Sequence, residues 1–307
     1  MSLYKSGFVA IAGRPNMGKS TFLNQVLGEK IAIVTPKAQT TRTRILGVCH
    51  RPDSQIVFLD TPGIHDTRQH RYGTLNKAMV KTAYESCRDV DLILFFVDAK
   101  QGVTEEDRTI LSRLPRGSAK LFMVLNKVDL VKPDRLIKRL AQISKIDTHW
   151  DEVIPISALT GQQVEPLLTL ILDHLSEGPP FYPPDKITDQ PERFIAAEMI
   201  REKVFLLLSR ELPYTTAVQL DRFEEAKGRL EIDATILVER ASQKPILIGK
   251  RGAMLKRIGS QARQDLEGLF EIQVVLKLWV RIRKGWMDSQ AQLRDLGYPD
   301  GRGDEKV

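Results

Sequence analysis

A glycine-rich segment near the start of the chain has the composition and spacing to surround a phosphate group. Residues 13–20, GRPNMGKS, fit the pattern GxxxxGK(S/T), after an apolar run that predicts a strand and before a stretch with helical periodicity. Backbone N–H groups of such a loop, with the N-terminus of the helix, can bind phosphate oxygens. Lys19 would reach the β and γ phosphates of a nucleotide, and Ser20 would coordinate Mg²⁺. An ordinary glycine turn is the alternative for this segment taken alone.

A second motif predicts the other side of the phosphate site. DTPG, residues 60–63, ends the apolar strand Gln55–Leu59. There the Asp60 carboxylate could reach the metal through water, and the Gly63 N–H could meet the γ-phosphate. Elsewhere the same four residues would be a common turn. The predicted phosphate-binding residues are Gly13, Arg14, Pro15, Asn16, Met17, Gly18, Lys19, Ser20, Asp60, Thr61, Pro62, Gly63 and Ile64.

Two further strand ends carry residues suited to a guanine base. NKVD, residues 126–129, follows an apolar strand, and Asp129 can accept two hydrogen bonds from guanine that adenine cannot supply. Because the wrong base would leave that carboxylate unpaired, discrimination for GTP can reach ~10⁴. Ala158 N–H would face the guanine oxygen, and Lys127 would lie along the ring. The predicted guanine-binding residues are Asn126, Lys127, Asp129, Ser157, Ala158 and Leu159.

A basic stretch near the C-terminus predicts a second binding surface. Residues 240–263 contain no acidic residue, and their cations form a local positive field. Within them, GKRG at residues 249–252 joins two helical patterns. A glycine-linked helix pair with a solvated basic face is the alternative. The cations are Arg240, Lys244, Lys250, Arg251, Lys256, Arg257 and Arg263, and Ile246, Ile248, Leu255 and Ile258 could form an apolar wall beside them.

The elements that position these motifs predict two domains. Residues 1–175 alternate apolar strands with amphipathic helices, which is typical of an α/β domain with a mainly parallel sheet. A proline-rich stretch, 176–192, is interpreted as a linker, and 193–307 form a smaller α+β domain with a tail. The strands predicted in the first domain are Phe8–Ala12, Gln55–Leu59, Leu92–Val97, Leu121–Leu125 and Val153–Ile156. The second should run helix 194–209, strands 216–223 and 230–238, a short helix to Gly249, a helix to Leu269 and strand 272–282.

Composition excludes several other classes of protein. The 307 residues include only two cysteines, without metal-ligand spacing, so neither a disulfide framework nor a structural zinc site is predicted. The longest apolar run, Leu92–Val97, is too short to cross a membrane, and the N-terminus lacks the features of a signal peptide. We therefore expect a cytoplasmic protein. The net charge of +7 permits an anionic partner but does not identify one.

The first domain resembles the Era-like GTPases of the translation-factor-like class. The resemblance rests on GRPNMGKS, AQTTR and DTPG and covers residues 7–175. It implies that Thr41 coordinates Mg²⁺ in the GTP state, with Thr40 beside it in the first switch. Ile64 stands where Ras-like enzymes place a water-orienting glutamine, so intrinsic hydrolysis should be slow. Asn16 would hold a K⁺ ion that acts as an arginine finger does, or would simply bond the loop.

The second domain resembles a KH domain of the type II arrangement found in bacterial proteins. In such domains the GxxG loop clamps a single strand's backbone while unstacked bases occupy a groove. The predicted RNA-binding residues are Ile246, Ile248, Gly249, Lys250, Arg251, Gly252, Lys256 and Arg257. Trp279 and Trp286 could stack on bases, but core packing is preferred for both. His65 is expected to face solvent rather than to act as a base.

A GTPase domain followed by one KH domain is the architecture of the Era family. The resemblance implies binding of GTP and GDP and of the 3′ end of 16S ribosomal RNA, and a role in small (30S) subunit assembly and rRNA maturation. It further implies peripheral association with the membrane, and we expect a monomer. Two alternatives remain at this point: a signalling GTPase whose second domain docks a protein, and a membrane-linked regulator whose basic face meets anionic lipid.

Overall fold

A computed structural model describes residues 4–65, 73–115, 117–143, 145–146 and 150–298. The chain divides into two compact units. The first contains residues 1–32, 41–69 and 79–189, and the second contains 33–40, 70–78 and 190–307. Two short segments of the amino-terminal half therefore belong to the carboxy-terminal unit.

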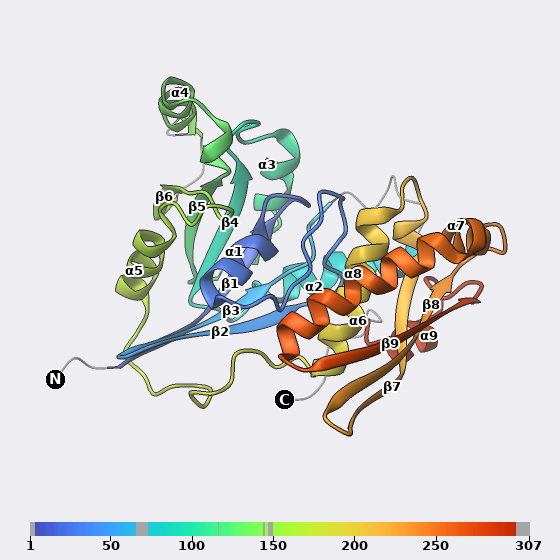
Figure 1. Ribbon diagram of the computed structural model, residues 1–307. Helices are drawn as coiled ribbons and strands as arrows, with labels where there is room; N and C mark the ends of the chain where they lie inside the picture. The colour runs from blue at the N-terminus through green and yellow to red at the C-terminus, as the bar shows by residue number, and fades with distance from the viewer. Residues whose placement is uncertain (1–3, 66–72, 116, 144, 147–149, 299–307) are drawn as a thin grey trace. The chain divides into compact units, whose positions relative to one another are not determined.

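The first unit is built on a six-stranded sheet in the order β2-β3-β1-β4-β5-β6 (Figure 1). Among the described strands of this sheet, only β2 is antiparallel to its neighbour, so the predicted mainly parallel α/β sheet is confirmed. The strands are β1 (Lys5–Gly13), β2 (Ile45–Arg51), β3 (Ser54–Asp60), β4 (Leu92–Asp98), β5 (Lys120–Asn126) and β6 (Glu152–Pro155). Its helices are α1 (Lys19–Leu27), α2 (Gly73–Glu85, whose first residues belong to the second unit), α3 (Glu105–Leu111), α4 (Pro133–Ile143) and α5 (Val164–His174).

Both faces of this sheet are buried because side chains alternate along each strand. Val9 and Ile11 of β1 pack in one apolar cluster with residues of α1 and α5. Ala10 and Ala12 pack in another cluster with residues of α2, α3 and α4. Burial on both sides explains why these strands appear in the sequence as continuous apolar runs.

The stretch predicted as a linker is bonded to the first unit through Gln55 of β3. The side chain of Gln55 is fully buried, and its Oε1 accepts hydrogen bonds from Phe181 N at 2.7 Å and Tyr182 N at 3.0 Å. Its Nε2 donates to Tyr182 O at 2.8 Å. Nearby, Val48 N donates to Ile187 O at 2.8 Å, so this extended segment also satisfies backbone groups of the edge strand β2.

The second unit covers one face of a three-stranded sheet, β7-β8-β9, with helices. Strands β7 and β8 are antiparallel and β9 is parallel to β8. The elements are α6 (Glu192–Leu207), β7 (Thr216–Ala226), β8 (Arg229–Val238), α7 (Gln243–Ile248), α8 (Ala253–Phe270), β9 (Gln273–Ile282) and α9 (Gln290–Asp295). This order agrees with the one predicted, except that α9 was not expected.

The two candidate stacking tryptophans have different environments. Trp286 is fully buried and its Nε1 donates to Thr215 O at 3.3 Å, as the preferred core assignment predicted. Trp279 is 44% exposed, so the same assignment is wrong for this residue. It lies on β9 between neighbours that point to the opposite face, because side chains alternate along a strand.

None of the helices in the described part of the chain has the length and apolar content needed to span a membrane.

Replacing Gln55 with leucine should detach residues 176–189 from the first unit. Leucine has a similar volume but cannot bond Phe181 or Tyr182, and the unsatisfied backbone groups should cost about 2–4 kcal/mol. We expect a lower free energy of unfolding and faster proteolytic cleavage within 176–189. Gln142→Leu is the control, because Gln142 is exposed and its Oε1 accepts a hydrogen bond only from Arg139 among the contacts described. Equal cleavage of the two variants would contradict this account.

Candidate functional site

The loops at the carboxyl ends of β1, β3, β4 and β5 bring together residues that are distant in sequence. Gly13 ends β1, Asp60 ends β3, Asp98 ends β4 and Asn126 ends β5. Neighbouring parallel strands end at the same edge of a sheet, and this is where ligands bind in open α/β folds. The predicted motifs therefore converge on one place.

The glycine-rich loop follows a path that requires glycine at two positions. Gly13 has φ 134°, and a Cβ there would lie 2.6 Å from the Phe96 carbonyl oxygen. Gly18 has φ 90° and precedes α1 as its N-cap, and a Cβ there would lie 2.2 Å from Asn126 Nδ2. The glycine has no side chain to cap this helix end, so the first N–H groups of α1 are available to an anion.

Lys19 is the buried cation of the loop. Its Nζ donates to Gly13 O at 3.1 Å and to Arg14 O at 2.9 Å, which folds the loop around the ammonium group. Burial lowers the pKa of Lys19 to about 8, although the neighbouring Asp60 carboxylate opposes the shift. A cation that is poorly solvated in this way interacts strongly with an added phosphate.

Three oxygen atoms meet beside Lys19. Ser20 Oγ lies 2.9 Å from Thr41 Oγ1 and donates to Asp60 Oδ2 at 2.7 Å. The other carboxylate oxygen, Asp60 Oδ1, is buried and has no hydrogen-bond partner among the described residues. Burial raises the pKa of Asp60 to about 6, and Lys19 and the Ser20 hydroxyl offset part of that shift. Hydroxyl and carboxylate oxygens with one unsatisfied atom fit a hard divalent cation such as Mg²⁺.

Thr40 does not share this position with Thr41. The Thr40 hydroxyl donates to Lys37 O at 2.8 Å and lies 2.7 Å from Thr35 Oγ1, so it closes a local loop. Of the two threonines predicted for the switch, only Thr41 lies at the Ser20–Asp60 pair.

The DTPG turn packs directly on the glycine-rich loop. A Cβ on Gly63 would lie 2.6 Å from both the N and the Cα of Pro15. Thr61 Oγ1 donates to Ile11 O at 2.8 Å, and Ile64 N donates to Gly13 O at 3.2 Å. Pro62 is also buried in this turn. A displacement of one loop must therefore displace the other.

Both residues after this turn are buried. Ile64 is 2% exposed and its side chain belongs to the core cluster on the α2–α4 face. His65 is 9% exposed and its Nδ1 lies 3.0 Å from Gly63 O, so the expectation that it faces solvent is wrong. Packing of the loop against the domain buries a histidine that the sequence placed in a turn.

The NKVD and SAL segments meet through Asn126. Its Nδ2 donates to Met17 O at 2.7 Å, and its Oδ1 accepts from Ala158 N at 2.9 Å. The Asn126 side chain thus links the glycine-rich loop to the loop that contains Ala158. The Ala158 N–H was predicted to face a guanine oxygen, and the structure differs by bonding it to Asn126.

Lys127 and Asp129 belong to the same NKVD segment as Asn126 but have other partners. Asp129 is exposed, and its Oδ1 accepts a hydrogen bond from Ser157 Oγ at 2.6 Å, which orients the carboxylate. Lys127 Nζ donates to Asn16 O at 2.6 Å and to Asp98 Oδ2 at 2.9 Å. Leu159 is 74% exposed and could cover one side of a ring.

Asp98 was missed by the sequence analysis, although it follows a recognised strand. Desolvation opposes its ionisation, but hydrogen bonds from Lys127 and the backbone hold the pKa of Asp98 below its ordinary value. Its signal was an acidic residue directly after the apolar run Leu92–Val97.

Two side chains of the glycine-rich loop point away from the site or remain unassigned. Arg14 Nε donates to Asp107 Oδ1 at 2.8 Å and its Nη2 donates to Gln101 Oε1 at 2.9 Å, so only its backbone can meet a phosphate. Asn16 adopts φ 62°, and its predicted K⁺ contact stays a prediction.

The GKRG turn in the second unit shares two properties with the glycine-rich loop of residues 13–20: glycines with positive φ, and a glycine at the N-cap of the helix that follows. Gly249 has φ 75°, and a Cβ there would lie 2.7 Å from Met254 Cβ. Gly252 has φ 80° and is the N-cap of α8, an 18-residue helix, and as a glycine it provides no side-chain cap. Lys250 and Arg251 between the glycines are exposed. Positive side chains and a helix N-terminus without a side-chain cap thus occupy one turn.

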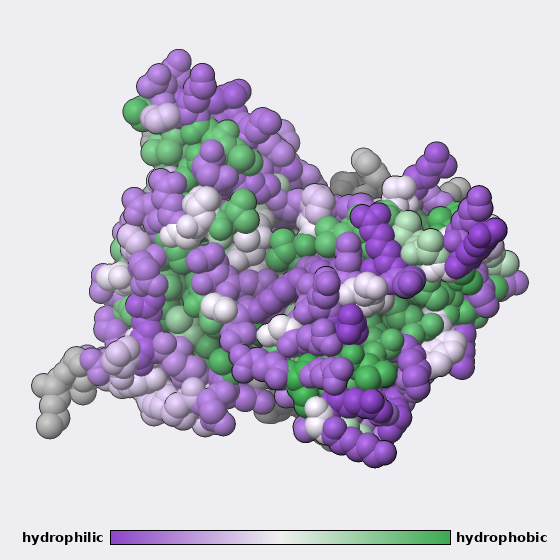
Figure 2. Space-filling model, viewed as in Figure 1, coloured by the Kyte–Doolittle hydropathy of each residue, from purple (hydrophilic) through white to green (hydrophobic). Residues whose placement is uncertain are grey.

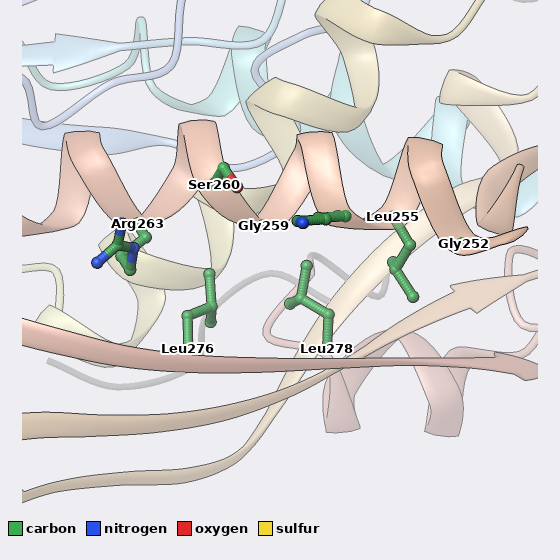
Figure 3. Close-up of a pocket in the computed structure, with 8 residues that line it drawn as sticks. Gly252, Leu255, Gly259, Ser260, Arg263, Leu276 and Leu278 are labelled. Carbon is green, nitrogen blue, oxygen red and sulfur yellow. The ribbon is translucent and has the colours of Figure 1, made fainter.

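A groove of about 390 Å³ begins at this turn and runs between α8 and β9. Leu276 and Leu278 point from β9 toward α8 and form its floor (Figure 3). Apolar surface is visible along this strip between hydrophilic side chains (Figure 2). At Gly259 a Cβ would lie 3.3 Å from Leu278 Cδ1, so a small residue keeps the helix close to the strand. The lining residues are Gly252, Leu255, Lys256, Gly259, Ser260, Arg263, Leu276 and Leu278.

The predicted residues of this surface are only partly in the groove. Gly252 and Lys256 line it, whereas Arg257 does not, and Ile246 is 59% exposed outside it. Ile248 packs against the core, and Ile258 is fully buried there, so Ile258 is not part of an apolar wall for a ligand. Among the lining residues, Gly259, Ser260, Leu276 and Leu278 were missed by the sequence analysis, and Arg263 was named there only as a cation of the basic stretch.

Replacing Gly63 with alanine should weaken nucleotide binding by about tenfold. The added Cβ would meet backbone atoms of Pro15, and displacing packed backbone costs ~1–3 kcal/mol. Gly268→Ala is the matched control, because no atom of the described residues lies within 4 Å of a Cβ built there. Isothermal titration with GDP would check both variants. A Gly63→Ala protein that binds GDP as tightly as the control would contradict the close packing of the two loops.

Comparisons with known proteins identify a family for each part of the chain. Residues 8–127 match the family described as 50S ribosome-binding GTPase, and residues 211–287 match the KH domain family. The GTPase Era of Geobacter metallireducens is 50% identical over 297 residues, which cover 96% of this chain and 98% of that protein. The GTPase Era of Lacticaseibacillus paracasei is 48% identical over 97% of this chain and 98% of its own length.

Two solved structures are similar over the same extent. A crystal structure of Era in complex with MgGDPNP and nucleotides 1506–1542 of 16S ribosomal RNA has a TM-score of 0.92 and 40% identity, covering 96% of this chain and 99% of that one. A crystal structure of an Aquifex aeolicus Era variant bound to GDP and AlF₄⁻ has a TM-score of 0.91 with the same identity and coverage. The chain is a GTPase with a KH domain and belongs to the Era family.

Proposed function

We propose that this GTPase binds the 3′ end of 16S ribosomal RNA through its KH groove and acts in small-subunit assembly and rRNA maturation. GTP with Mg²⁺ would set the affinity of that groove. One observation carries the proposal. A groove with an apolar floor starts at a basic glycine turn, on the same chain as a nucleotide site. The related Era structure with MgGDPNP and a 16S RNA fragment supports the choice of both ligands.

The chemistry of the groove favours RNA over an anionic lipid or a docked protein. A backbone phosphate would bind at the turn of Lys250 and Arg251, beside the N-terminus of α8. Unstacked bases would lie along the strip lined by Leu255, Leu276 and Leu278. A lipid surface would need only the charge, not a narrow apolar groove of this kind. Peripheral association with the membrane remains an implication of the family alone.

In the nucleotide site, backbone N–H groups of residues 13–20 and Lys19 would bind the phosphates. Ser20, Thr41 and, through water, Asp60 would hold Mg²⁺, which neutralises charge on the β and γ phosphates. The exposed Asp129 carboxylate, oriented by Ser157, would select guanine. Because the Ile64 side chain is buried in the core, the attacking water must be positioned by other groups. A K⁺ ion at Asn16 is our proposal for one of them.

The switch follows from where γ-phosphate contacts can form. Thr41 and Gly63 would contact the γ-phosphate side of the nucleotide in the GTP state only, so GTP would favour one arrangement of the loops that carry them. By linkage, RNA that favours this arrangement must raise GTP affinity by the same factor.

Asp129→Asn should reduce affinity for GTP by about a hundredfold and raise affinity for xanthosine triphosphate. The amide cannot accept both guanine N–H groups, but it can donate to the additional carbonyl of xanthine. Competition binding with the three nucleotides GTP, ATP and xanthosine triphosphate would measure this. Asp134→Asn, on the first turn of α4, is a control with the same change of charge. Unchanged GTP preference in Asp129→Asn would exclude this residue from the base site.

Changing Lys250 and Arg251 together to aspartate should abolish RNA binding while GTP binding is retained. The turn would lose two cations and gain two anions where a phosphate binds, a change worth about a hundredfold or more at moderate salt. The measurement compares a strand from the 16S 3′ end with a scrambled strand, in GDP and in a non-hydrolysable GTP analogue. Lys132→Asp with Arg135→Asp, both exposed on the first unit, is the charge-matched control.

Sequence-preferring binding that strengthens with the analogue and disappears in the Lys250–Arg251 variant supports the proposal. Binding that is indifferent to strand sequence and nucleotide, or equal in the two double variants, overturns it.

A further inference from the structure

Arg201 of α6 is a buried cation with a specific backbone partner. It is 0% exposed, and its Nη2 donates both to Glu198 Oε2 and to the carbonyl oxygen of Thr40. Its Nε donates to Glu198 Oε1 at 2.7 Å, so the carboxylate binds one edge of the guanidinium through two hydrogen bonds. The guanidinium carbon also lies 5.0 Å from the centre of the Phe205 ring. These contacts fix the orientation of the Arg201 guanidinium that donates to the Thr40 carbonyl.

Three more hydrogen bonds join the C-terminal half of α6 and Leu208, just after it, to the same short segment. Glu202 is 2% exposed, and its Oε1 accepts from Val34 N at 2.9 Å. The ammonium group of Lys37 donates to the carbonyl oxygens of Phe205 and Leu208, at the C-terminal end of α6. A cation at this end of a helix is also favoured by the helix dipole.

Residues 33–40 depend on these contacts because they have no regular secondary structure. The segment belongs to the second unit, whereas the next residue, Thr41, belongs to the first. Thr41 Oγ1 lies 2.9 Å from Ser20 Oγ at the candidate metal site. The Thr40 carbonyl that Arg201 binds and the Cα of Thr41 belong to the same planar peptide unit.

We propose that Arg201 is a positioning residue for Thr41, and that it acts by fixing the carbonyl of Thr40 so that the Thr41 hydroxyl stays at the Ser20–Asp60 pair. The proposal rests on the proposed role of Thr41 as a ligand of nucleotide-bound Mg²⁺. In it, α6 of the RNA-binding unit contributes directly to the preference for GTP over GDP. This role requires no contact of Arg201 with the nucleotide or the metal.

The chemistry indicates where the effect must appear. The metal contact of Thr41 is expected with GTP and not with GDP, so a displaced Thr40–Thr41 peptide should weaken only GTP binding. A hydrogen bond from a charged donor contributes roughly tenfold to a hundredfold to an equilibrium. A purely structural role of Arg201 would instead lower thermal stability and leave the ratio of the two nucleotide affinities unchanged.

The test measures, in the full-length protein, the affinities for GDP and for a non-hydrolysable GTP analogue, with the Mg²⁺ concentration needed for half-maximal analogue binding. In Arg201→Lys the single amine can pair with Glu198 but cannot hold Thr40 in the same fork. We expect the analogue preference to fall about tenfold, with GDP affinity within about twofold. Because a lone buried Glu198 could destabilise the fold, Glu198→Gln with Arg201→Met is the second variant, with the same expected loss.

Arg193→Lys is the matched control, since Arg193 also lies on α6 and donates to a backbone carbonyl, that of Leu220 at 3.0 Å. Thr41→Val reports on the metal role itself. A Thr41→Val protein with unchanged analogue preference would overturn the proposed role of Thr41 and this inference with it. If Thr41→Val loses the preference while both Arg201 variants keep it, only the inference fails.

Combining Thr41→Val with Arg201→Lys gives a further criterion. If Arg201 acts through Thr41, the double variant should lose no more analogue preference than Thr41→Val alone. Additive losses would show that Arg201 acts elsewhere and would overturn the proposal. Equal loss of GDP and analogue affinity in the Arg201 variants would do the same.

Discussion

A carboxylate removed from solvent, Asp60, imposes the arrangement on which the nucleotide site depends. A buried charge is costly unless partners replace its hydration. Lys19 and Ser20 supply part of that replacement, and they stand on the helix that follows the neighbouring strand. One oxygen, Oδ1, remains unsatisfied within the described residues, which suits a cation that the site would acquire with a nucleotide. The fold therefore leaves one oxygen of Asp60 without a partner, and a bound metal ion would supply that partner.

Close packing around glycine governs both units. At Gly13, Gly18 and Gly63 a single Cβ would collide with backbone or with a bonded side chain. In the second unit, Gly249 and Gly259 allow a turn and a helix to approach their neighbours in the same way. Gly18 and Gly252 are also the N-caps of α1 and α8, and a glycine provides no side chain to cap the helix. Such helix N-termini bind phosphates well. The two binding surfaces are alike in this physical sense although their folds differ.

The segment 33–40 shows how one part of the chain can serve two units. It lies in the amino-terminal half of the sequence, yet its polar contacts with Arg201, Glu202 and the end of α6 place it in the carboxy-terminal unit. Without helix or strand bonds of its own, its position is decided by those partners. The peptide bond between Thr40 and Thr41 connects this segment to the Ser20–Asp60 pair, where the Thr41 hydroxyl lies. The boundary between the two units therefore falls inside a loop of the nucleotide site.

The sequence by itself determined the α/β sheet, the order of elements in the KH unit and the loops at the strand ends. It could do so because the periodicity of apolar residues and the spacing of glycines are local properties of the chain. It could not determine the antiparallel edge strand β2, the burial of His65 or the exposure of Trp279, because each depends on which distant residues pack nearby. Likewise, Leu276 and Leu278 line a groove only because β9 lies beside α8, and Asn126 bonds two loops that are distant from it in the sequence. Motifs depend on neighbours in the chain, whereas shared surfaces arise from pairings between segments far apart in it, and only the tertiary structure decides those.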